Sequence, residues 1–140
     1  MSWGHQHGLA FARQLKISLE AESGGLGELI EQVESFWRKE LAPHFRDEEE
    51  ILFPAASLKN SACQALVKRA LDDHRNLCDY LQSLRSKLRV GESHQVLTEF
   101  ADLLTSHIRF EERELFPLIE TSLSPAVLDH IGALLGRPRV

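Results

Sequence analysis

Two copies of one eleven-residue pattern constrain this chain more than any other feature of its sequence. Residues 44–54 read HFRDEEEILFP, and residues 107–117 read HIRFEERELFP. In each copy a histidine precedes a glutamate by four residues, and residues four apart lie on one face of an α-helix, about one turn from each other. Each copy can therefore direct an imidazole and a carboxylate towards a common point. Two such segments facing each other would hold two metal ions bridged by carboxylates.

The rest of the sequence predicts helices that would carry these segments. Loop-forming residues divide the chain into predicted long helices at residues 3–21, 26–53, 61–88 and 93–118, followed by a short helix at 125–135. No segment alternates between apolar and polar residues as a strand would. Four long helices with short connections predict an all-α, up-down-up-down four-helix bundle with a short C-terminal helix. The length of 140 residues suits one domain, so we expect residues 1–140 to form a single di-metal-binding domain.

Apolar residues recur along one face of each long helix, and in every helix that face reaches an ionisable residue. In the first two helices the faces contain His5, Leu9, Ala12, Leu15 and Leu19, and Ile30, Val33, Trp37, Leu41, His44 and Glu48. In the other two they contain Val67, Leu71, His74, Cys78, Leu81 and Leu88, and Val96, Phe100, Leu104, His107, Glu111 and Leu115. Carboxylates buried without a cation would be strongly destabilising. The pattern therefore predicts a buried metal cluster.

Most other acidic side chains are expected to lie outside this cluster. Helical spacing turns Glu49, Glu50 and Glu112 away from the inward face, so we predict that they face solvent. Asp47 and Glu114 lie nearer its edge, where they could contact the ligands from outside.

The remaining histidines are also assigned by their spacing along the helices. His7 should face outward if the first helix has already begun there, and it is otherwise the spare ligand. We predict that His94 lies at the surface and that His130 is partly buried on the terminal helix.

Composition narrows the location and the partners of the chain. The formal net charge is -5, and the basic residues are scattered, which argues against nucleic acid as a partner. No apolar run approaches the roughly 20 residues that span a membrane, and the N-terminus lacks the features of a signal peptide. Cys63 and Cys78 lie about 22 Å apart along one predicted helix, too far for a disulfide. These observations predict a cytoplasmic protein.

With these residues placed, the chain resembles the hemerythrin-like family, named for a His-His-Glu cation-binding pattern. The resemblance rests on residues 5–9 (HQHGL), 73–75 (DHR) and the two copies of the repeated motif. It implies a non-haem di-iron centre inside a four-helix bundle. Carried over residue by residue, it implies terminal ligands at His5, His44, His74 and His107, and bridging carboxylates at Glu48 and Glu111.

One departure from the oxygen-carrying members concerns the third helix, where those proteins place two histidines one turn apart. Here Ala70 and Cys78 stand four residues to either side of His74. An imidazole is therefore missing unless His7 or another group supplies it. Cys78 could bind metal as a thiolate, but a buried apolar role is the favoured interpretation. Fewer protein ligands would leave more open positions, which favours reactivity over reversible storage of O2.

The donor set favours iron, with two ions expected per chain. Mixed imidazole and carboxylate donors suit iron and also manganese or zinc, whereas calcium and magnesium prefer oxygen alone. Ferritin-like di-iron proteins use Glu-x-x-His, the reverse order with a different spacing, which disfavours iron storage. The leading hypothesis is an O2-binding or O2-sensing protein, or one that binds a related diatomic such as NO. The alternatives are a di-iron oxidase, peroxidase or NO-consuming enzyme with an electron-donor protein, a metal-dependent iron or redox sensor, and a structural zinc site.

Overall fold

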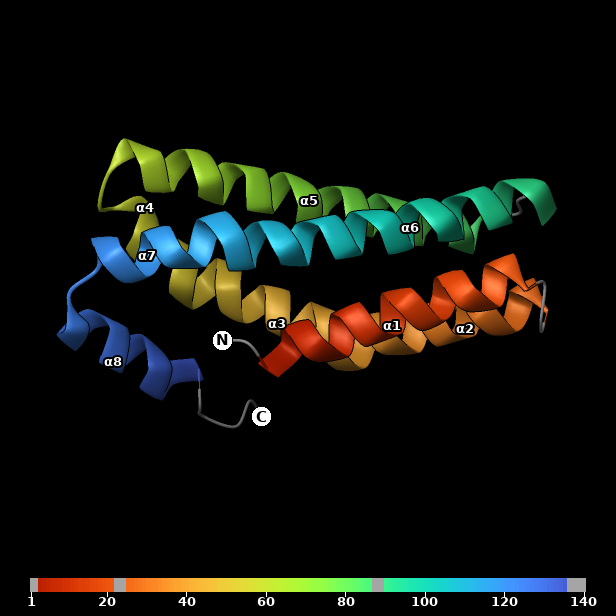
Figure 1. Cartoon of the computed structure of the whole chain (residues 1–140), viewed down its shortest axis with the longest axis horizontal. Coiled ribbons are helices and arrows are strands. Elements are labelled where there is room, and N and C mark those ends of the chain that lie inside the picture. The colour runs from red at the N-terminus through yellow and green to blue at the C-terminus, as the bar shows by residue number, and fades with distance from the viewer. Residues whose placement is uncertain (1–2, 22–24, 87–89, 136–140) are drawn as a thin grey trace.

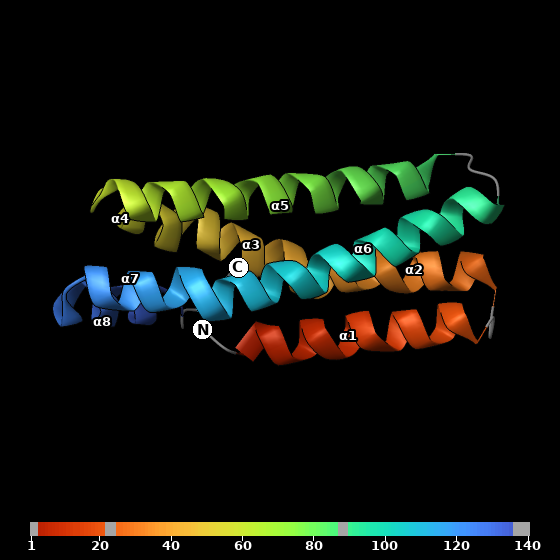
Figure 2. The ribbon, with the colours of Figure 1, turned by 45° about the horizontal axis from the view of Figure 1, so that its top comes forward.

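The computed structural model describes residues 3–21, 25–86 and 90–135. Within these ranges the regular secondary structure is helical, and no strand occurs in them. Four long helical segments run side by side, and a shorter helix lies at one end of the group (Figures 1 and 2). The predicted all-α bundle with a short C-terminal helix is confirmed. None of the helices in the described ranges has the length and apolarity that a membrane span requires.

Several shorter elements join end to end to make the second and fourth long helices. The first helix is α1 (Trp3–Glu20), and the third is α5 (Ser61–Arg85). The second consists of α2 (Leu26–Phe36), η1 (Trp37–Leu41), α3 (Ala42–Asp47), η2 (Glu48–Leu52) and α4 (Phe53–Ser57). The fourth consists of α6 (Val90–Phe110), η3 (Glu111–Leu115) and α7 (Phe116–Ser122), and α8 (Pro125–Leu135) follows it. The predicted end of the third helix, Leu88, lies outside the described residues.

The three η elements are π-helical turns, and each ends just before the residue that precedes a proline. The N–H groups of Ala42, Phe53 and Phe116 donate to the carbonyls five residues earlier, those of Trp37, Glu48 and Glu111. A proline has no N–H, and its ring crowds the carbonyl four residues before it. The wider turn accommodates the ring, so the helices continue to Ser57 and Ser122, past the ends predicted at residues 53 and 118. The π-helical turn η1 ends at Leu41, two residues before Pro43, where the sequence predicted a kink.

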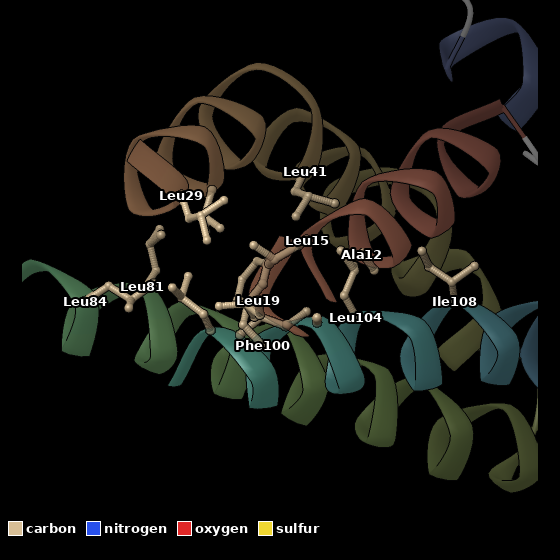
Figure 3. Packing of buried hydrophobic residues seen from close by; sticks show 14 of the residues in the cluster. Ala12, Leu15, Leu19, Leu29, Leu41, Leu81, Leu84, Phe100, Leu104 and Ile108 are labelled. Carbon is tan, nitrogen blue, oxygen red and sulfur yellow. The ribbon is translucent and has the colours of Figure 1, made fainter. Parts of the chain in front are cut away.

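The apolar core consists of two clusters of buried residues. One joins α1, α2, α5 and α6 and includes Leu15, Leu81 and Phe100 (Figure 3). The other joins the end of the second helix to α5, α7 and α8 and includes Leu52, Val67, Ile119 and Ile131. Along the second, third and fourth helices, the residues of one cluster give way to those of the other where the ionisable residues occur. The polar cluster is therefore enclosed by apolar residues at both ends.

The predicted inward face of the third helix is wrong in one detail. Leu77 and Ala70 are fully buried and His74 is 5% exposed, whereas Cys78 is only partly buried. Cys78 instead lines a groove of about 670 Å³ together with Trp37, Phe45, Leu71 and His74. The helix rotates by 100° per residue, so a shift of one position changes which side chain faces inward. Leu71 and Cys78 were predicted to face inward, but the inward positions are Ala70 and Leu77, one residue earlier.

Close contact between α1 and α6 depends on Gly8. A Cβ atom at this position would lie 2.6 Å from Cδ1 of Ile108. Real Cβ atoms essentially never approach so closely. Glycine at position 8 thus lets the backbone of α1 approach α6 one turn away from His5.

Candidate metal centre

Each of the four long helices places one histidine at the same level of the bundle. His5 lies on α1, His44 on α3, His74 on α5 and His107 near the end of α6. Two buried glutamates lie at this level as well, Glu48 at the start of η2 and Glu111 at the start of η3. All six side chains predicted as ligands are thus gathered in one cluster, and all except His44 are buried, with exposed fractions of 5% or less.

The six side chains form two groups that share both glutamates. One group is His5, His44, Glu48 and Glu111, and the other is His74, His107, Glu48 and Glu111. In each group, one ligand atom from every residue lies within 4.8 Å of the others. Among the described residues, neither His7 nor Cys78 belongs to either group. Each group therefore offers two imidazoles and two shared carboxylates.

Imidazole nitrogens approach the two carboxylates closely from all four helices. The Nε2 atom of His5 lies 3.0 Å from Oε1 of Glu111, and that of His74 lies 3.1 Å from Oε1 of Glu48. Within the two motif copies, Nε2 of His44 lies 3.4 Å from Oε2 of Glu48, and Nε2 of His107 lies 3.5 Å from Oε1 of Glu111. The Nε2 atoms of His74 and His107 are 3.2 Å apart. Polar atoms of six residues thus converge on one small volume.

Four of these converging atoms lack a properly oriented hydrogen bond. They are Nε2 of His44, both carboxylate oxygens of Glu48 and Oε2 of Glu111. Buried polar atoms in folded proteins almost always have a partner, since leaving one without a partner costs about 1 to 3 kcal/mol. Cations bound in the two groups would give these atoms the partners that they lack. The residues present therefore fit a metal ion.

Ionisation within the cluster is strongly perturbed in the absence of a cation. Burial and the neighbouring His107 lower the pKa of His74 to about 3. Burial and the neighbouring Glu48 raise the pKa of Glu111 to about 8. Burial also lowers the pKa values of His44 and His107, but the nearby carboxylates of Glu48 and Asp73 outweigh it and raise both. Metal binding requires neutral histidines and ionised glutamates, so a cation must displace protons to bind here.

Aromatic rings pack against three of the clustered histidines. Phe45 stacks on His74 with 3.8 Å between ring centroids, and Phe116 stacks on His5 at 5.1 Å. Phe45 also meets His107 edge-on. These contacts limit the rotation of the imidazoles.

Three acidic residues that were not predicted as part of the site contact its histidines from outside. Glu112 lies 3.2 Å from Nδ1 of His5, Glu49 lies 3.1 Å from Nδ1 of His74, and Asp73 lies 2.9 Å from Nδ1 of His107. Glu49 and Glu112 are exposed as predicted, with side chains 46% and 41% exposed, but the prediction did not include their contacts with the clustered histidines. The sequence did contain a signal for these two residues, because a second glutamate directly follows the first in both motif copies.

The π-helical turns explain why the spacing argument missed these glutamates. That argument assumed 100° per residue, but Glu48 and Glu49 lie on η2, and Glu111 and Glu112 lie on η3. A turn closed by a bond to the fifth residue is wider than an α-turn, so each residue advances by a smaller angle. The side chains of consecutive glutamates therefore point in more similar directions, and both can contact histidines of the cluster.

The remaining sequence assignments divide between confirmed and corrected ones. His7 and His94 are exposed as predicted, and Nε2 of His94 lies 3.3 Å from the carbonyl oxygen of Leu19. His130 is exposed, contrary to the prediction of partial burial, because α8 turns it away from the bundle. Asp47 is half-buried and its charge helps raise the pKa of His44. Glu114 instead pairs with Arg69 at the surface.

Comparison with known proteins identifies the family. The model of the hemerythrin HHE cation-binding domain matches residues 3–119. This range covers most of the chain and includes all six clustered side chains. The protein belongs to the hemerythrin HHE cation-binding family. No significant match was found among curated proteins or among solved structures.

Proposed function

We propose that this chain is a non-haem di-iron protein that binds or senses O2 or a related diatomic molecule such as NO. The observation that carries the proposal is the pair of four-residue groups that share Glu48 and Glu111. Because the two groups overlap at both glutamates, they would support two cations that share two carboxylates. The family match and the orphaned buried oxygens of Glu48 point in the same direction.

Each residue of the cluster has a distinct part in this proposal. His5 and His44 would be the terminal ligands of one ion, and His74 and His107 those of the other. Glu48 and Glu111 would bridge both ions, and their negative charges would offset part of the positive charge. Two ferrous ions bound here would supply electrons and open coordination positions for a diatomic ligand. A set of four protein donors per ion leaves such positions free.

Apolar residues around the cluster would control access to it. Leu41, Leu77, Leu104 and Ile108 are buried in the core beside the histidines, and Trp37 packs partly buried against them. Such a lining admits small apolar molecules such as O2 and excludes bulk water. It would also protect a bound ligand from solvent protons.

A second candidate function, a di-iron oxidase, peroxidase or NO-consuming enzyme, is favoured by the groove beside His74. The groove is open to solvent and includes Glu49, which contacts Nδ1 of His74. α5 also contributes a single histidine to the cluster. Solvent access on this side would favour turnover over reversible binding.

Optical spectroscopy of the reduced, iron-loaded protein tests the proposal. Addition of O2 or NO under otherwise anaerobic conditions should produce a new visible absorption, which His107→Ala should abolish. Reversal of the O2 signal on deoxygenation would indicate a carrier or sensor. Steady consumption of O2 or NO with an added reductant would indicate the enzyme. Iron-loaded protein that responds to neither gas would refute both.

A further inference from the structure

The two consecutive glutamates of each motif copy contact the same histidine of another helix, one at Nε2 and the other at Nδ1 of the ring. Glu48 and Glu49 lie on the second helix, and Glu49 reaches His74 on α5. Glu111 and Glu112 lie on the fourth helix, and Glu112 reaches His5 on α1. Asp73 on α5 likewise contacts Nδ1 of His107 on α6. Three of the four clustered histidines therefore have a carboxylate behind the ring.

All three of these contacts are made by Nδ1, the ring nitrogen farther from the shared glutamates. An ionised carboxylate can only accept a hydrogen bond, so beside one Nδ1 carries the proton and donates it. A neutral imidazole protonated at Nδ1 presents an unprotonated Nε2 at its other side. In His5 and His74 that Nε2 lies 3.0 Å and 3.1 Å from oxygens of Glu111 and Glu48. Two lone pairs so close need a proton or a cation between them, and a metal ion bound at Nε2 would take the place of that proton.

We propose that Glu49, Glu112 and Asp73 are positioning residues that fix the tautomer and the orientation of His74, His5 and His107. This inference rests on the proposed function, because the orientation matters only if Nε2 binds a metal. Each carboxylate holds the proton on Nδ1, keeps Nε2 available as a donor to the metal and makes the imidazole more basic. The repeated motif thus has three working parts: a ligand histidine, a bridging glutamate and a glutamate that orients a histidine of another helix.

The alternative is that Glu49 and Glu112 are ordinary surface acids. Their half-exposed side chains agree with that view, but Glu114 on the same π-turn as Glu112 shows what such an acid does here. Its carboxylate lies 3.4 Å from Nη1 of Arg69, and both side chains are about half exposed. Glu114 therefore provides a matched control that removes one negative charge near the site without touching a clustered histidine.

The test uses zinc as the probe, because it is diamagnetic and suits the same donors. Release of bound Zn²⁺ to a chelator should be about 10- to 100-fold faster in Glu49→Ala and Glu112→Ala than in the wild type. Glu49→Gln and Glu112→Gln retain an acceptor oxygen and should show smaller effects. Glu114→Gln should behave as the wild type does. The glutamine variants keep the shape of the side chain, so they remain informative if an alanine variant fails to fold.

Nitrogen-15 NMR of histidine-labelled, zinc-loaded protein supplies a readout that a purely structural role would not change. The wild type should show His74 and His5 protonated at Nδ1 and metal-bound at Nε2, and each alanine variant should lose this pattern at one histidine. Zinc release and histidine spectra that match those of Glu114→Gln would overturn the inference while leaving the metal centre intact. Wild-type protein that holds no zinc through these histidines would overturn the proposed function together with the inference.

Discussion

Glu48 and Glu111 occupy equivalent positions in the two copies of the repeated motif, and they interact with each other inside the bundle. Burial and Glu48 raise the pKa of Glu111 to about 8. Two carboxylates in an apolar interior repel each other when both are ionised, and a cation that both bind removes this repulsion. In the metal-free protein a proton on Glu111 therefore reduces the repulsion between the two carboxylates. A metal ion would replace this proton in the metal-loaded protein.

Substitution of one shared carboxylate should affect the metal-free and metal-loaded proteins in opposite directions. At pH 8.5, Glu111→Gln should raise the free energy of unfolding of the metal-free protein by on the order of 1 kcal/mol, because it removes a buried negative charge. It should also prevent binding of a metal pair. Chemical denaturation with and without metal measures both effects. Glu114→Gln serves as the control, and equal effects of the two substitutions would count against a shared buried carboxylate.

The stability of the metal-free protein should fall as the pH rises from about 6.5 to 8. Glu111 has a raised pKa, so between its unfolded value of 4.5 and its folded value of about 8 the folded state binds more protons. His44 and His107, whose pKa values are also raised, act in the same direction above 6.5. His74, lowered to about 3, acts oppositely, but only below 6.5.

Metal should reverse this trend, because its ligands must be deprotonated. Thermal unfolding from pH 6 to 8.5, with excess chelator or with bound metal, measures the difference. The melting temperature of the metal-free protein should decline over this range, and the increment that metal adds should grow. An increment that is constant with pH would contradict proton displacement by the metal.

A methyl group at position 8 should disturb the contact between α1 and α6. Gly8→Ala would place a Cβ atom 2.6 Å from Cδ1 of Ile108, the end of a flexible side chain that must shift. Because alanine also favours the helix by about 1 kcal/mol over glycine, the net loss of stability should be about 1 kcal/mol or less. Metal affinity should fall as well, because His5 lies one turn away. Ile108→Val removes Cδ1, so the double variant should recover most of the loss. Denaturant titration of both variants checks this, and no recovery would argue that the clash is not the cause.

The π-turn before Pro43 should contribute to the placement of His44. Pro43→Ala restores a backbone N–H and removes the ring that disfavours an α-turn, so the second helix should straighten near η1. Retention of metal against a chelator should weaken, with little loss of helix content by circular dichroism. Pro125→Ala, at the start of α8 and away from the cluster, is the control. Unchanged retention in Pro43→Ala would show that the bend does not position His44.

The sequence was sufficient to predict the bundle and the six clustered side chains, because both depend on helical periodicity. His5, for example, continues a stripe that contains Ala12, Leu15 and Leu19, and all of these residues are buried. In the regular helices periodicity identified most of the buried positions, with one error in α5. Cys78 was predicted to face inward, but the neighbouring Leu77 is the residue that is buried in the core.

Periodicity failed where the helix itself changes its geometry. Glu49 and Glu112 reach histidines on other helices because η2 and η3 are π-helical, and a constant angle per residue cannot represent such turns. Pro54 was interpreted as a helix end, although it follows a wider turn that accommodates it. Contacts between helices, such as that of Asp73 with His107, depend on the packing and not on spacing within one helix.

The measurement that tests the central claim most directly is an anaerobic titration of the metal-free protein with ferrous iron, with bound iron counted per chain. The shared use of Glu48 and Glu111 predicts about two ions per chain, bound together, and loss of both in Glu48→Ala. Binding of a single ion, or retention of one ion at full affinity in Glu48→Ala, would contradict a centre in which two metals share these carboxylates.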